Sequence, residues 1–153
     1  MAKRTIEQEV RRLGAIEDIK QLKARYCAAC DDNYNPDDLV AMFVEDATWD
    51  GGDFGVHRGH KEIHTFFSGI SGAIVFAGHL VVNPIIEVAE DGLSATGKWW
   101  LIMPCTVDED GKKESRWLFA EYSDEYVCVD DEWLYRSLKL HQHHFVPHLK
   151  GWS

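Results

Sequence analysis

Apolar residues recur at steps of three and four from residue 6 to residue 32, with charged residues between them. This spacing predicts one long amphipathic helix within residues 6–32. Gly14 interrupts the pattern and could separate a frayed first segment from a docked second one. The apolar positions that carry the pattern are Ile6, Val10, Leu13, Ile16, Ile19, Leu22 and Tyr26.

Turn residues follow the first helix. Asn35 and Pro36 fit an N-cap and a first helical position, and they predict a short second helix within residues 36–45. A strand over 47–49, a Gly-Gly turn and a return strand over 54–58 come next. Gly59 then opens a third helix, predicted over 59–70.

Four long strand-like runs fill the rest of the chain, separated by short polar turns that imply antiparallel hairpins. Three helices before a long sheet predict an α+β domain, in which the helices pack on one face of a strongly bent antiparallel sheet. A cone-shaped cavity between these layers is then expected, within one domain over 1–153. The four runs are 74–88, 93–107, 112–129 and 133–146.

Composition and charge narrow the function classes. Hydrophobic residues at 45% and charged residues at 27% are typical of a soluble globular protein. A formal charge of −10 without a basic cluster disfavours nucleic acid and anionic membranes as partners. The chain starts without an apolar leader, which favours a cytoplasmic protein. Four cysteines are too few for a disulfide framework, so reduced thiols are expected.

Four stretches are similar to a known family: residues 15–26 with Asp31 five residues later, Gly78-His79, residues 95–100, and residues 122–126 ending at Trp133. In combination they resemble the SnoaL-like family of the nuclear transport factor 2-like (NTF2-like) superfamily. Within it, proteins like bile acid 7α-dehydratase and scytalone dehydratase look nearest.

The resemblance implies a cone-like α+β barrel and elimination or isomerisation without a cofactor or metal. It matches the family's catalytic tyrosine, aspartate and histidine to Tyr26, Asp31 and His79. The family's arginine near the end of the last strand falls on or near Gln142, so the anchoring of substrate departs from the family pattern here.

The same residues support this chemistry on their own. His79 lies in an apolar strand, where a carboxylate partner would orient an otherwise costly imidazole, and Asp31 is the candidate partner. Such a pair can abstract a proton while Tyr26 donates to a leaving hydroxyl or an oxyanion. The alternative is a structural role, with His79 bonded to backbone and Tyr26 packed in the core.

Other histidines and cysteines carry weaker signals. His60 and His64 have the helical spacing of a metal pair, but the zinc-protease glutamate is misplaced, so surface histidines are favoured over a metal site. Cys27 and Cys30 have redox spacing but lie inside a helix, which favours packing.

Strand alternation decides which residues of the last strand face the cavity. The more apolar face carries Gln142 and His144, and His144 could partly replace the missing arginine. His141 and His143 then face outward or toward a subunit interface. The residues expected to bind substrate are Trp49, Phe54, Trp99, Leu138, Leu140, Gln142 and His144.

These observations predict a cofactor-independent dehydratase or isomerase for a hydrophobic ring compound that carries a hydroxyl or carbonyl. A non-catalytic subunit that binds a small molecule, or a scaffold, is the alternative. Fold alone does not choose between them, whereas Tyr26, Asp31 and His79 in one closed pocket would. Apolar outer strand faces also predict a homodimer or homotrimer.

Overall fold

A computed structural model describes residues 4–151 of the protein. Its first helix, α1 (Ile6–Asp31), begins with a capping box in which the side chains of Thr5 and Gln8 each accept a hydrogen bond from the other's backbone N–H. This pairing satisfies amides that have no partner inside the helix. The helix continues unbroken through Gly14, so the first segment is not frayed, but only the segment after Gly14 is docked: its buried residues begin at Ala15.

Two short helices lie beside a small hairpin. Asn35 caps α2 (Pro36–Val40) by accepting from the amides of Asp37 and Asp38, as its sequence predicts. The helix is shorter than predicted, because the chain already enters β1 (Phe43–Asp50) three residues later. A 3-10 turn, η1 (Gly52–Phe54), then leads to β2 (Val56–Arg58) and to α3 (Gly59–Ile70), whose bounds are those predicted.

The remaining strands are β3 (Ile74–Ala77), β4 (Leu80–Val88), β5 (Ser94–Glu109), β6 (Lys112–Val129) and β7 (Glu132–Pro147). They join β1 and β2 in a seven-stranded sheet of order β2-β1-β7-β6-β5-β3, with β4 also paired to β5. The sheet is mixed, because β1 runs parallel to β7, and the prediction of a purely antiparallel sheet is wrong. Local patterns of polarity do not encode such a long-range pairing.

The predicted run over 74–88 is two strands rather than one. β3 pairs with the second half of β5 and β4 with its first half, in the same register. Between them, the amide of Gly78 donates to the carbonyl of Pro104, whereas the amide of His79 leaves the ladder and donates to Asp31. His79 follows Ala77 by two residues, so both face the buried side of the sheet.

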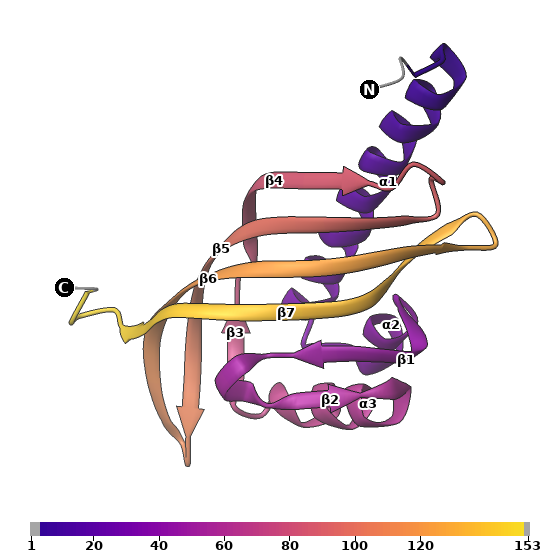
Figure 1. Ribbon diagram of the computed structural model, residues 1–153. Helices are drawn as coiled ribbons and strands as arrows, with labels where there is room; N and C mark the ends of the chain where they lie inside the picture. The colour runs from indigo at the N-terminus through magenta and orange to yellow at the C-terminus, as the bar shows by residue number, and fades with distance from the viewer. Residues whose placement is uncertain (1–3, 152–153) are drawn as a thin grey trace.

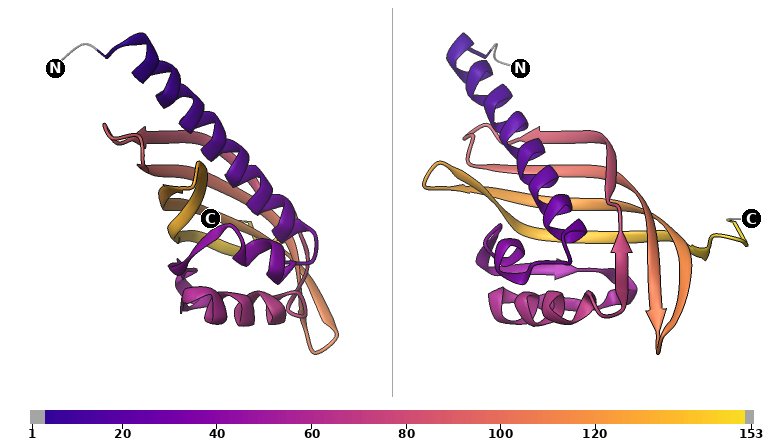
Figure 2. Two further views of the ribbon diagram at one scale, coloured as in Figure 1. Left: turned by 90° about the vertical axis from the view of Figure 1, so that its right-hand side faces the viewer. Right: turned by 180° about the vertical axis from the view of Figure 1, so that it is seen from behind.

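All three helices lie on one side of the curled sheet, with α1 running across its concave face (Figures 1 and 2). The α+β fold with helices on a strongly bent sheet is therefore confirmed. The first turns of α1 project beyond the sheet, and Ile6, Val10 and Leu13 are exposed there. Within residues 4–151, no helix has the length and apolar character needed to cross a membrane.

Candidate active site

Asp31 and His79 meet where the end of α1 reaches the break between β3 and β4. The Asp31 carboxylate lies 2.6 Å from Nδ1 of the His79 ring and accepts from the His79 backbone amide at 3.0 and 3.2 Å. The His79 side chain is 6% exposed and that of Asp31 36%. This contact orients the ring: because a carboxylate can only accept, Nδ1–H donates to it, and in the neutral ring Nε2 then carries the lone pair.

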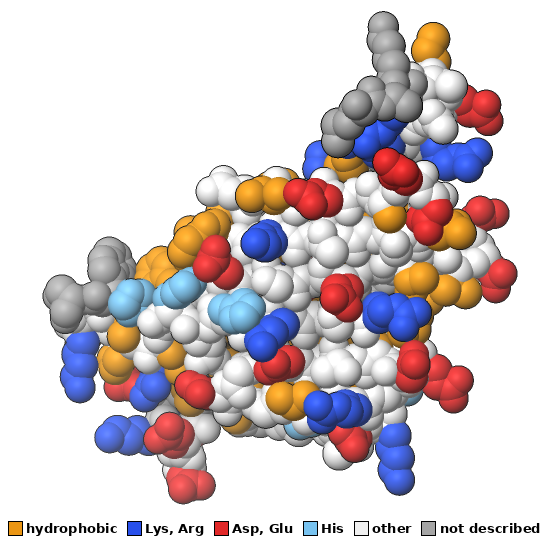
Figure 3. All heavy atoms as spheres, in the orientation of Figure 1, with side chains coloured by type: hydrophobic (Ala, Val, Ile, Leu, Met, Phe, Trp, Pro, Cys, Tyr) orange, Lys and Arg blue, Asp and Glu red, His pale blue; other side chains and the backbone are white. Residues whose placement is uncertain are grey.

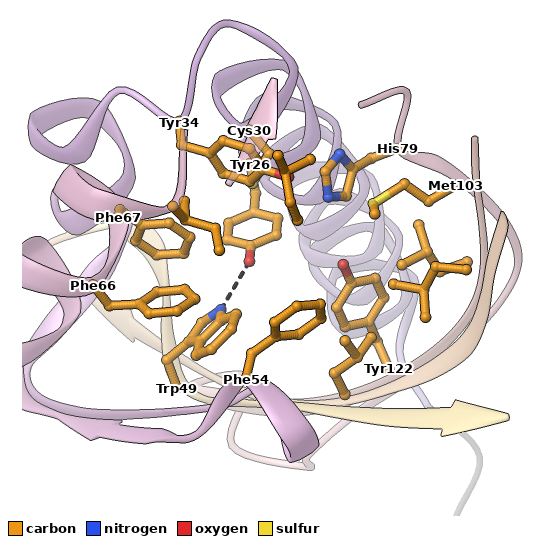
Figure 4. Close-up of a pocket in the computed structure, with 15 residues that line it drawn as sticks. Tyr26, Cys30, Tyr34, Trp49, Phe54, Phe66, Phe67, His79, Met103 and Tyr122 are labelled. Atoms are coloured by element: carbon orange, nitrogen blue, oxygen red, sulfur yellow. Dashed lines mark hydrogen bonds between the residues drawn. The ribbon is translucent and has the colours of Figure 1, made fainter. Parts of the chain in front are cut away.

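An aromatic pocket lies on the other side of the His79 ring (Figure 4). Its cavity has a volume of about 40 Å³ and lies between α1, α3 and the concave face of the sheet. Most of its lining is aromatic or aliphatic, a composition typical of sites for apolar small molecules. The lining residues are Tyr26, Cys30, Tyr34, Trp49, Phe54, Phe66, Phe67, Ile70, Ile74, His79, Leu101, Met103, Leu118, Tyr122 and Leu140.

Tyr26 shares this pocket with His79, and its side chain is almost completely buried. Its hydroxyl accepts a hydrogen bond from the indole N–H of Trp49 at 2.9 Å. Burial raises the pKa of Tyr26 well above its usual value, and neighbouring Cys30 adds to this effect, so the phenol stays protonated. Within residues 4–151, no hydrogen bond joins Tyr26 to Asp31 or His79, and the Cys30 thiol is a second polar neighbour of its hydroxyl.

The structure divides the residues that were expected to bind substrate into two groups. Trp49, Phe54 and Leu140 line the pocket. Leu138 and Trp99 are buried but lie outside its lining, and the Trp99 indole instead donates to the hydroxyl of Tyr126 at 3.1 Å.

Gln142 and His144 face opposite sides of the sheet because a bulge in β7 lies between them. Gln142 pairs with buried Ala120 and faces inward, where its buried amide nitrogen has no hydrogen-bond partner among residues 4–151. The extra residue then shifts the register, so that His144 pairs with Phe119 on the outer face and its ring contacts that of Phe119. The prediction that His144 faces the cavity and replaces the family's arginine is therefore wrong.

The other candidate groups have local partners. His60 Nε2 lies 2.7 Å from the Phe43 carbonyl, and His64 Nε2 lies 2.9 Å from the Asp37 carboxylate. Cys27 and Cys30 are free, buried thiols inside α1. Burial raises the pKa of Cys27 to about 11, which opposes formation of a reactive thiolate.

Several pocket residues were missed by the sequence analysis, chiefly Tyr34, Phe66, Phe67 and Tyr122. The Tyr34 ring packs edge-on against His79, with ring centroids 6.0 Å apart. Tyr122 alternates with buried Ala120 along β6, so the strand period could have indicated that it faces inward. Tyr34 gave no such signal, because it lies in a turn with a positive φ of 53°.

Comparisons with known proteins agree with this architecture. Residues 11–139 match the sequence model of a family described as the SnoaL-like domain. Among curated proteins, none matches the chain in sequence.

Three solved structures illustrate the likeness in fold. Hexachlorocyclohexane dehydrochlorinase LinA-type3 from Novosphingobium barchaimii has a TM-score of 0.80 at 19% identity, over 91% of this chain and 93% of the other. A scytalone dehydratase candidate from Novosphingobium aromaticivorans has a TM-score of 0.80 at 20% identity, over 92% and 91%. An NTF2-like protein with a cystatin-like fold from the same organism gives 0.67 at 19%, over 86% and 84%.

Proposed function

Since the chain belongs to the SnoaL-like domain family, we propose that it is a cofactor-independent lyase, most simply a dehydratase, or an isomerase. Its substrate is a hydrophobic ring compound that carries a hydroxyl or carbonyl. His79 is the general base, Asp31 orients it, and Tyr26 donates a hydrogen bond to the substrate oxygen.

The contact of 2.6 Å between Asp31 and His79 Nδ1 carries this proposal. Because Nδ1–H is committed to the carboxylate, Nε2 can take a proton from a carbon acid in the pocket. Asp31 then stabilises the imidazolium that forms. In an elimination, the electron pair of the broken C–H bond becomes the new double bond. The hydroxyl leaves as water after it has received a proton, either from a proton donor in the pocket or from the His79 imidazolium.

The walls of the pocket support the class of substrate. Trp49 packs against Phe66 and Phe67, with ring centroids 4.5 and 5.4 Å apart, and these rings offer flat apolar surfaces to a ring compound. Water excluded from such a pocket would no longer compete for the base or the oxygen acceptor. The chemical names of the dehydrochlorinase and the scytalone dehydratase candidate, both proteins of similar fold, agree with elimination on rings.

The test is a screen of hydroxylated steroid-like and polyketide-like ring compounds, followed by mass spectrometry. Loss of water, or uptake of solvent deuterium at carbon, is expected with the wild type. Both signals should disappear in His79→Ala and fall strongly in Asp31→Asn. His144→Ala is the matched control, because that histidine lies on the outer face of β7.

One result would overturn the proposal. If the wild type binds such compounds without exchanging a substrate proton, and Asp31→Asn and His79→Ala keep the same affinity, the protein is a binding module instead.

A further inference from the structure

Tyr122 presents a free hydroxyl to the pocket. Its side chain is 3% exposed, and it lines the cavity on the side of β6. Figure 4 shows the hydroxyl pointing into the pocket, toward the side where His79 lies. Among residues 4–151, no group forms a hydrogen bond with it, in contrast to Tyr26 and Tyr126, whose hydroxyls are both bonded. The hydroxyl is not one of the fully enclosed polar atoms of residues 4–151, so it is open to the pocket and available to a bound molecule.

A buried ion pair lies behind the Tyr122 ring. The Lys23 ammonium is 3.3 Å from the ring centroid and 2.9 Å from the Asp124 carboxylate, and both charged side chains are 0% exposed. The hydroxyl of Tyr126 also donates to Asp124 at 2.8 Å. Removing two charges from water costs free energy that a packed apolar pair would not cost. The cation is also 5.4 Å from the ring of Tyr26, but it is in closest contact with the ring of Tyr122, and this contact indicates a role for it at that tyrosine.

A cation against an aromatic face attracts the electron density of the ring. When a phenol donates a hydrogen bond, electron density moves from the O–H bond onto the oxygen and the ring, so the ammonium favours this donation. Burial raises the pKa of Tyr122 well above its usual value, and the nearby Cys27 and Cys30 add to this. The group is therefore a hydrogen-bond donor, and it does not act as a base.

We propose that Tyr122 donates a hydrogen bond to an oxygen atom of the bound ring compound, and that the Lys23–Asp124 pair strengthens this donation from behind. Tyr122 is then a substrate-binding residue, and Lys23 is a positioning residue that acts through it. The inference rests on the proposed function, because it needs a ring compound in the same pocket. It adds that an oxygen atom of that compound, in a carbonyl or hydroxyl group, lies beside the Tyr122 hydroxyl.

The test compares two probes of similar shape, 2-acetylnaphthalene and 2-ethylnaphthalene, by quenching of tryptophan fluorescence. The wild type should bind the ketone more tightly than the hydrocarbon. Tyr122→Phe should lose about tenfold in ketone affinity, as expected for one hydrogen bond, and should keep its hydrocarbon affinity. Tyr135→Phe is the matched control, because it removes a buried tyrosine hydroxyl that has no hydrogen-bond partner within residues 4–151 and does not line the pocket.

The carbonyl stretch of the bound ketone measures the strength of the hydrogen bond directly. It should lie at lower wavenumber in the wild type than in Tyr122→Phe. It should lie between these values in Lys23→Met/Asp124→Asn, which removes both buried charges together. If that double variant does not fold, Lys23→Gln replaces it, since its amide can still donate to Asp124.

The results of this test can be distinguished from the results of the test of the proposed function. The role of Tyr122 would be overturned if wild type and Tyr122→Phe had the same ketone affinity and the same carbonyl stretching wavenumber of the bound ketone. An unchanged stretch in the Lys23 variants would overturn the role of the ion pair. If Tyr122 contributes to binding but the catalytic screen shows no proton exchange, the proposed function is contradicted and this inference is not. If neither probe binds the wild type, both the pocket assignment and this inference fail.

Discussion

The carboxylate of Asp31 holds His79 at two points, the backbone amide and ring Nδ1, through hydrogen bonds of 2.6 to 3.2 Å. One side chain thus fixes both the path of the chain between β3 and β4 and the orientation of the imidazole. Substitutions at Asp31 can separate these two effects.

Asp31→Asn should keep the path of the chain, because an amide oxygen can still accept from the His79 N–H. It should nevertheless lower kcat by about 10³-fold, since the amide cannot stabilise an imidazolium. Asp31→Ala should lower kcat as much and also release the backbone. The measurements are turnover of a substrate from the screen and hydrogen exchange of the His79 amide, which should speed up only in Asp31→Ala. Wild-type turnover in both variants would contradict the role of Asp31.

The cysteines should react more slowly with thiol reagents the more deeply they are buried. Burial raises the pKa of Cys27 and of Cys105 to about 11, so at pH 8 only about one thiol in a thousand is ionised. Because the thiolate is the reactive form, labelling of these sites should rise about tenfold per pH unit below that value. Cys128 is only partly buried, and native protein should consume Ellman's reagent there first. Loss of the fast phase in Cys128→Ser is the check; fast labelling of Cys27 would refute this ordering.

Two glycines should respond oppositely to alanine. Gly14 is exposed within α1, and a Cβ there would meet nothing within 4 Å, so Gly14→Ala should stabilise the fold by about 1 kcal/mol. At Gly97 an added Cβ would lie 2.8 Å from the Tyr126 ring, and Gly97→Ala should destabilise by about 1–3 kcal/mol. Urea denaturation of both variants measures this difference, and the reverse order would contradict the packing described.

Self-association remains a prediction, and the outer face of β4 and β5 is the surface we expect to carry it. Trp100 pairs with Val82 and Ile102 with Leu80, which together form an apolar patch beside the histidines of β7 (Figure 3). The wild type should sediment as a dimer or trimer at micromolar concentration, and Trp100→Glu should sediment as a monomer. Leu13→Glu, on the projecting part of α1, is the control. A monomeric wild type would rule out this association.

Much of the fold could be predicted from local patterns. The spacing of apolar residues predicts α1 to within a residue, and the residues around Gly59 predict α3. The parallel contact of β1 with β7 could not be predicted this way, because it joins segments far apart in sequence. The early start of β1 at Phe43 was missed for the same reason, since its partner Tyr135 lies in the last strand.

Prediction of the candidate site depended on a different kind of information. The resemblance to a family brought Asp31 and His79 together, and the structure finds them in contact, although their catalytic role stays a proposal. Strand alternation correctly predicts that Leu140 faces inward but fails at His144, because one unpaired residue in β7 reverses the pattern. The inward orientation of Tyr34 depends on the geometry of a turn, and the periodicity of a strand or helix does not describe turns.

The bulge in β7 shifts by one residue the alternation of side chains between the two faces of the sheet. Before it, Leu140 and Gln142 face the concave side; after it, Phe145 does, where its ring meets that of Phe54 at the pocket wall. If the strand were regular here, with the same sequence and no bulge, alternation would turn His144 inward and Phe145 outward. The bulge therefore decides whether a histidine or a phenylalanine faces the cavity, and a comparison that assumes regular alternation along β7 would misjudge which residues meet a ligand.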